Sequence, residues 1–186
     1  MASGGAQVEN TTIGRDRVEG NQFNAPTTIH NHNAPPDKRE RILSTIDPAP
    51  QGVGVMGREE QLADLDRRMG EPGNNLRLVV HGESGVGKSE LLREYARRHE
   101  GRYPGGRYWI DCRLNLEQEI ARIGRHCWQM DWLEGPLAEQ ASNVLQQLAK
   151  EKVLLLLDNA SSEEQLEPFL PPAGQAHVLI SSTSRD

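Results

Sequence analysis

Residues 76–98 read LRLVVHGESGVGKSELLREYARR and carry the clearest structural signal in the chain. The stretch opens with a short apolar run that predicts a strand, and it closes with apolar residues at helical spacing. Between them, GESGVGKS at residues 82–89 fits the phosphate-binding pattern GxxxxGK[ST]. Its glycines permit positive φ angles and a close approach of the backbone to an anion, and the following helix directs its N-terminus at the same place. The stretch therefore predicts a P-loop that binds the phosphates of a purine nucleotide.

Two side chains of this loop have a defined chemistry. Lys88 brings a mobile positive charge to the β- and γ-phosphates, and Ser89 offers a hydroxyl to Mg²⁺. We expect the nucleotide to contact the whole loop and the first residue after it, namely Gly82, Glu83, Ser84, Gly85, Val86, Gly87, Lys88, Ser89 and Glu90.

A second motif, VLLLLDN at residues 153–159, places Asp158 directly after an apolar run. Such a run is typical of a strand that is buried on both faces. A carboxylate at the carboxyl end of that strand fits a Walker B acid, which holds Mg²⁺ through water. An aspartate that merely ends a strand is the alternative for Asp158 alone. Paired with the P-loop, it predicts a metal site made by Ser89 and Asp158.

Strand and helix signals alternate along the chain. Alternation of this kind indicates a parallel sheet with helices on both faces, so we expect an α/β, doubly wound P-loop NTPase fold. Apolar runs predict strands at 76–81, 107–112, 152–157 and 177–180. Helical spacing predicts helices at 59–69, from the loop to about 99, at 116–127 with Asn115 as its cap, and at 137–148.

Composition divides the chain into three parts and excludes several classes of protein. Residues 1–37 are polar and rich in Asn, Thr, Gly and Pro, which predicts a disordered tail; residues 38–52 read as a linker, and residues 53–186 as the nucleotide-binding domain. A net charge of −6 and a pI of about 5.6 argue against nucleic acid as a partner. The N-terminus carries no secretory signal, and no apolar run is long enough to span a bilayer. We therefore expect a cytoplasmic protein.

Five motifs, in order, resemble the NB-ARC branch of the STAND class of P-loop ATPases. They are VMGREEQL at 55–62, the P-loop, YPGGRYWIDC at 103–112, LLLLDNA at 154–160, and EPFLPP followed by HVLISSTSRD at 167–186. The resemblance implies that the nucleotide is ATP or ADP. It also implies that the backbone beside Met56 and the side chain of Arg58 contact the base and sugar side, and that Arg185 reports on the γ-phosphate.

The resemblance implies a function as well. Domains of this family are signalling switches in NLR-like immune and cell-death receptors, with slow Mg²⁺-dependent hydrolysis of ATP. Lys88, Asp158, Asn159 and Arg185 take the catalytic positions. The family often has a second acid where Asn159 stands, and an amide cannot accept a proton. At most a slow ATPase is expected.

Two other interpretations stay open: an AAA-type ATPase enzyme acting in a larger assembly, and an interaction protein whose P-loop is vestigial. The family continues beyond the position of Asp186 with a fifth strand and further domains, so we expect a domain that is incomplete on its C-terminal side. Partners are expected to be a second copy of the chain or other signalling proteins, reached through those domains and the tail. Residues 8–33 are weakly similar to amyloid-forming signalling motifs.

Overall fold

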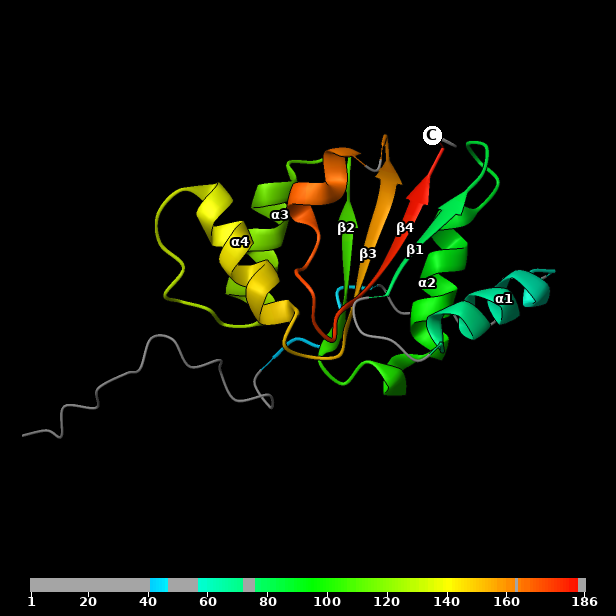
Figure 1. Ribbon diagram of the computed structural model, residues 1–186, viewed down its shortest axis with the longest axis horizontal. Coiled ribbons are helices and arrows are strands. Elements are labelled where there is room, and N and C mark those ends of the chain that lie inside the picture. Colours follow the sequence, from blue (N-terminus) through cyan, green and yellow to red (C-terminus); the bar gives the residue numbers. More distant parts are fainter. Residues whose placement is uncertain (1–40, 47–56, 72–75, 163, 184–186) are drawn as a thin grey trace, which may run out of the picture. The chain divides into compact units, whose positions relative to one another are not determined.

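Four parallel strands form one sheet in the order β1-β4-β3-β2 (Figure 1). The computed structural model describes residues 41–46, 57–71, 76–162 and 164–183. The strands are β1 (Arg77–His81), β2 (Gly106–Asp111), β3 (Val153–Ala160) and β4 (His177–Ser182). The expected α/β P-loop fold is confirmed. The predicted tail and most of the predicted linker lie outside the described residues.

The helices follow the predicted order. They are α1 (Glu59–Met69), α2 (Lys88–Arg98), α3 (Leu116–Arg122) and α4 (Leu137–Leu148), with 3₁₀ turns η2 (Glu100–Arg102) and η4 (Glu164–Phe169). Asn115 caps α3, because its side chain accepts a hydrogen bond from the backbone N–H of Gln118 at 2.8 Å. The prediction of a single helix at 116–127 is wrong in one respect, since its last part, η3 (Ile123–Cys127), is a π-helix.

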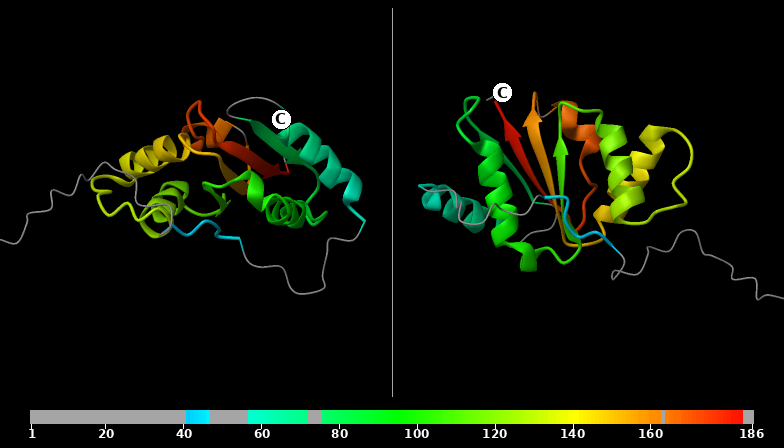
Figure 2. Two further views of the ribbon diagram at one scale, coloured as in Figure 1. Left: turned by 90° about the horizontal axis from the view of Figure 1, so that it is seen from below. Right: turned by 180° about the vertical axis from the view of Figure 1, so that it is seen from behind.

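The two faces of the sheet pack against different helices (Figure 2). Leu154 and Leu156 of β3 join a buried cluster with α1 and α2, whereas Leu155 and Leu157 join another with α3, α4 and η4. This division follows from the strand geometry, because successive side chains point to opposite faces. Every residue from Val153 to Asp158 is buried, which explains the continuous apolar run in the sequence.

One edge of the sheet is covered by a short segment, the strap, residues 41–46. The backbone N–H of Arg107 in β2 donates to Leu43 O at 2.8 Å, and Thr45 N–H donates back to Arg107 O at 3.1 Å. Arg41 lies over the ring of Trp128 at 3.9 Å and pairs with Glu151 at 2.9 Å. The strap, which belongs to the predicted linker, is therefore attached to β2.

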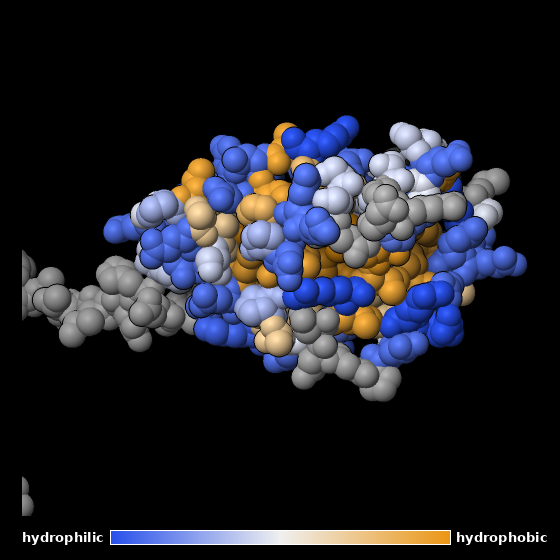
Figure 3. Space-filling view, turned by 45° about the horizontal axis from the view of Figure 1, so that its top comes forward, coloured by the Kyte–Doolittle hydropathy of each residue, from blue (hydrophilic) through white to orange (hydrophobic). Residues whose placement is uncertain are grey.

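The other edge is β1, whose pairing among the described residues is to β4 alone. Its side chains are exposed at both ends and half-buried between them. A hollow of about 410 Å³ lies beside it, lined by Leu78, Val80 and residues of α1. Figure 3 shows hydrophobic residues between hydrophilic ones on one face of the molecule.

Candidate nucleotide-binding site

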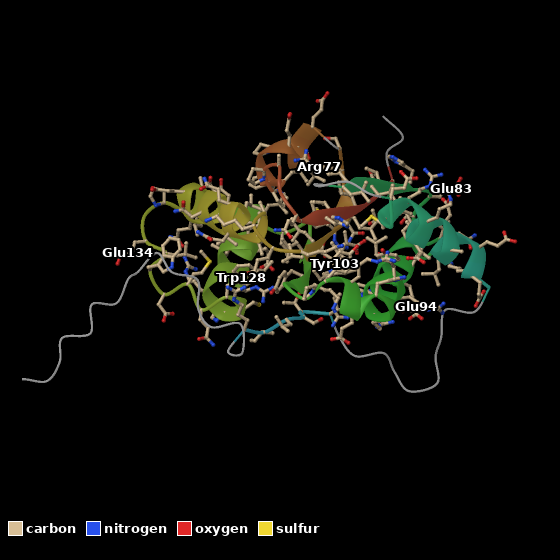
Figure 4. All side chains as sticks on the ribbon, turned by 60° about the horizontal axis from the view of Figure 1, so that its bottom comes forward. Arg77, Glu83, Glu94, Tyr103, Trp128 and Glu134 are labelled. Carbon is tan, nitrogen blue, oxygen red and sulfur yellow. The ribbon has the colours of Figure 1, made fainter. Side chains whose placement is uncertain are left out.

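The P-loop connects the carboxyl end of β1 to the start of α2. Gly85 and Gly87 have φ angles of 79° and 81°, which L-residues with a side chain rarely adopt. A Cβ at Gly87 would also lie 2.9 Å from the guanidinium of Arg58. Glu83, on the exposed part of the loop, is labelled in Figure 4. The glycine pattern is therefore required by the conformation of the loop.

Lys88 reaches back across the loop. Its Nζ donates to the carbonyl oxygens of Gly82 and Glu83, each at 2.8 Å. Gly87 is the N-cap of α2 and provides no side chain for capping, so the first N–H groups of this 11-residue helix face the loop with the helix dipole behind them. Positive charge and backbone donors are gathered where phosphates would bind.

Asp158 and Ser89 come together although they are far apart in the sequence. Ser89 Oγ donates to Asp158 Oδ1 at 2.8 Å, and Ser181 Oγ donates to the same oxygen. Asp158 is only 3% exposed. A hydroxyl and a carboxylate are hard oxygen ligands of the kind that Mg²⁺ takes, so the side chains present fit the predicted ion, directly or through water.

Asn159 interrupts the regular geometry of β3. Its φ angle is 62°, in the left-handed region, and the pairing of β3 with β4 shifts register between Leu157 and Ala160. The strand was expected to end at 157, and it instead runs through Asp158 and Asn159 to Ala160. Asn159 N–H donates to Ser181 Oγ at 3.0 Å, and its Nδ2 donates to Asp158 Oδ2 at 3.1 Å.

Two neighbours of this group were not singled out from the sequence: Ser181 and Asp111. Asp111 ends β2 opposite Asp158 in the parallel register, and its Oδ1 accepts from Asn159 Nδ2 at 3.3 Å. The signal was available, because Asp111 is a polar residue that directly follows an apolar run, as Asp158 does. Arg113 hydrogen-bonds the Asp111 carboxylate and lowers its pKa to about 2, so Asp111 is ionised at neutral pH.

Arg58 lies beside the P-loop, and its predicted contact with the base and sugar side of the nucleotide stays a prediction. It precedes α1, and its guanidinium donates to Gly87 O at 3.3 Å and to Val86 O. The Glu90 carboxylate is directed along α2 instead, 3.4 Å from Arg97. Met56 and Arg185 lie outside the described residues, so their predicted contacts with the nucleotide stay predictions.

This geometry defines a P-loop ATPase domain. Residues 54–180 match the AAA ATPase domain, and the chain belongs to that family. No curated protein matches the chain.

Among solved structures, the crystal structure of Cdc6p from Pyrobaculum aerophilum is similar at a TM-score of 0.52 and 20% identity, over 75% of this chain and 42% of that one. The chain thus spans less than half of that protein, and an identity this low supports the fold alone. The P-loop ATPase assignment is confirmed, and the findings support the AAA-type alternative better than the NB-ARC interpretation. Within the described residues, no helix could cross a membrane.

Proposed function

We propose that this domain binds ATP and ADP with Mg²⁺ and hydrolyses ATP slowly, as the nucleotide-dependent module of a larger AAA-type assembly. The observation that carries the proposal is the contact between Ser89 and Asp158, 2.8 Å apart at the carboxyl edge of the sheet. It joins the P-loop to the acid of a second strand, an arrangement with a clear use in phosphate and metal binding.

Binding needs only groups that are already in place. The N–H groups at the start of α2 and the ammonium of Lys88 would hold the phosphates, and that ammonium would exchange its bonds to Gly82 and Glu83 for phosphate oxygens. Ser89 and Asp158 would hold the ion. Bound Mg²⁺ would supply neutralisation of the phosphate charge.

Hydrolysis needs more than binding, because a water must be oriented toward the γ-phosphate. The residue after Asp158 is an asparagine, and an amide cannot act as a base. We therefore expect turnover well below the roughly 10 per second that is typical of enzymes. A slowly hydrolysing module would report its nucleotide state to the rest of an assembly.

Titration calorimetry tests the proposal. The full chain should bind ATP and ADP with one site per chain, and more tightly when Mg²⁺ is present. Lys88→Ala should lose the binding heat. Lys150→Ala should keep it, because this lysine precedes the amino end of β3 and the P-loop follows the carboxyl end of β1. Absence of binding by the unmodified chain would contradict the proposal and would favour a vestigial P-loop.

A second candidate is the nucleotide switch of an NLR-like receptor. The contact of Arg58 with the P-loop favours it, because that arginine belongs to the motif on which the NB-ARC resemblance rests. A switch should retain ADP through purification and release it slowly. Rapid exchange of a fluorescent ADP would favour the AAA-type proposal.

A further inference from the structure

The site has a second carboxylate, Asp111, that the proposed reaction has not used. The first carboxylate is Asp158. Asp158 is 3% exposed, and its two oxygens already accept hydrogen bonds from Ser89, Ser181 and Asn159. In the proposed function Asp158 holds the ion. The next residue, Asn159, is an amide and cannot act as a base. A carboxylate that accepts a hydrogen bond from the attacking water would therefore come from another strand.

Asp111 is on the correct face of the sheet. Trp109, two residues earlier in β2, packs against the buried cluster that contains residues of α1 and α2. The guanidinium of Arg93 in α2 lies over its ring, 4.3 Å from the ring centre. Residues two apart in a strand share a face, so the side chain of Asp111 also faces the side that carries α2. Its register partner is Asp158, which contacts Ser89 on that same side.

Asn159 connects the two carboxylates. Its Nδ2 donates to Asp158 Oδ2 at 3.1 Å and to Asp111 Oδ1 at 3.3 Å. The left-handed backbone of Asn159, with φ 62°, makes this connection, and residues held in such conformations are concentrated at functional sites. The amide fixes the position of Asp111 relative to the expected metal acid.

We propose, building on the proposed ATPase function, that Asp111 is the carboxylate that orients the hydrolytic water. Asp111 accepts a hydrogen bond from the water, which directs a lone pair of the water oxygen at the γ-phosphorus. The new O–P bond forms as the bond from the γ-phosphorus to the β,γ-bridging oxygen breaks. The electron pair leaves with ADP, and the hydrogens of the water end on the inorganic phosphate or in solvent.

The contacts of Arg113 with Asp111 are expected to keep turnover slow. The backbone N–H and the guanidinium of Arg113 both donate to the Asp111 carboxylate, from 2.9 to 3.1 Å for the Oδ1 contacts. The side chain of Arg113 is 71% exposed and that of Asp111 only 23%. An ion pair with so exposed a partner is weak, so the guanidinium can rotate away, but while it is bound it competes with water for the carboxylate.

The test measures ATP binding and turnover in the full chain. Asp111→Asn should lower kcat by about 100-fold, the usual scale for a lost catalytic acceptor, with the Kd for Mg-ATP changed less than about twofold. The double variant Asp111→Asn with Asn159→Asp, which exchanges carboxylate and amide, should recover at least about a tenth of the original rate. Asp131→Asn, at an exposed carboxylate in the loop before α4, is the matched control and should change neither constant.

Three outcomes would overturn the role of Asp111. The first is a kcat of Asp111→Asn within about threefold of the unmodified chain. The second is loss of turnover in Asp111→Asn with no recovery in the exchanged variant, because that pattern indicates only a structural role. The third is an unmodified chain that binds Mg-ATP but shows no Lys88-dependent turnover, which would leave the binding proposal intact. Failure to bind nucleotide would instead overturn the proposed function.

Discussion

The P-loop and the carboxyl ends of β2 and β3 differ in how they are built. The P-loop is one continuous stretch, Gly82–Ser89, and Lys88 contacts Gly82 and Glu83 within it. The strand ends instead combine residues that are up to 70 positions apart, including Asp111 and Ser181. The groups proposed to bind the phosphates are therefore encoded in one local stretch, whereas the groups proposed for the metal ion and for hydrolysis depend on strand order and register.

The largest effect is expected in the P-loop. Nucleotide at about 100 times its Kd should stabilise the fold by roughly 2.7 kcal/mol, and Lys88→Ala should remove most of that stabilisation. Thermal unfolding with and without Mg-ATP measures it. Undiminished stabilisation of the Lys88 variant would show that nucleotide binds elsewhere.

Substitutions of the adjacent β3 residues Asp158 and Asn159 should have different effects on nucleotide binding. Asp158→Ala should abolish the Mg²⁺ dependence of binding, because it removes the carboxylate that contacts Ser89. Asn159→Ala should leave the Kd nearly intact, with a modest loss of stability because alanine is strained at a φ of 62°. Calorimetry at several Mg²⁺ concentrations distinguishes the two. Equal effects on the Kd would contradict the separation of binding from hydrolysis.

Ser181→Ala tests whether β4 supports the acid. The Ser181 hydroxyl donates to Asp158 and accepts from Asn159 N–H, so its loss should cost about 1–3 kcal/mol of stability and weaken Mg²⁺-dependent binding. Ser182→Ala is the matched control: this buried hydroxyl donates to Ala160 O at 3.0 Å. Ser182→Ala should lower the stability of the fold without changing the Mg²⁺ dependence of nucleotide binding. If Ser182→Ala changed that dependence and Ser181→Ala did not, Ser181 would not belong to the site.

The smallest effect is expected at the amino end of the sheet, where β4 starts at His177. Burial lowers the pKa of this histidine below its usual 6.5, and Lys152 adds to the effect. A lowered pKa means that the fold favours the neutral ring, so its contribution to stability is present above pH 6.5 and is lost as pH falls below that value. His177→Gln should flatten the decline in denaturant stability between about pH 6.5 and 5. An unchanged decline would assign it to other groups.

The sequence predicted most of the fold because its signals are local. The apolar run at 153–157, the cap at Asn115 and the spacing in α1 each act within a few residues, and the structure agrees with them. The same locality explains why the P-loop could be identified. Periodicity carries no information about the π-helical end at Ile123–Cys127, where hydrogen bonding changes while the apolar face is kept.

The rest of the site required the tertiary structure. Ser181 and Asp111 belong to the group around Asp158 only because β4 and β2 flank β3, and strand order is not written in any one segment. The sequence shows that Asn159 stands where the resembled family often has an acid. Its left-handed backbone and its hydrogen bonds to two carboxylates go with the irregular pairing of β3 with β4. Long-range pairing thus accounts for what the sequence left out.

The rate of multiple-turnover ATP hydrolysis tests whether this chain binds ATP without hydrolysing it rapidly. With Mg-ATP at a concentration that calorimetry shows to be saturating, the full chain should hydrolyse ATP far more slowly than the roughly 10 per second of typical enzymes. The remaining rate should depend on Lys88. A rate near that of typical enzymes would contradict the account, because it would show that binding and hydrolysis are equally well built in this chain.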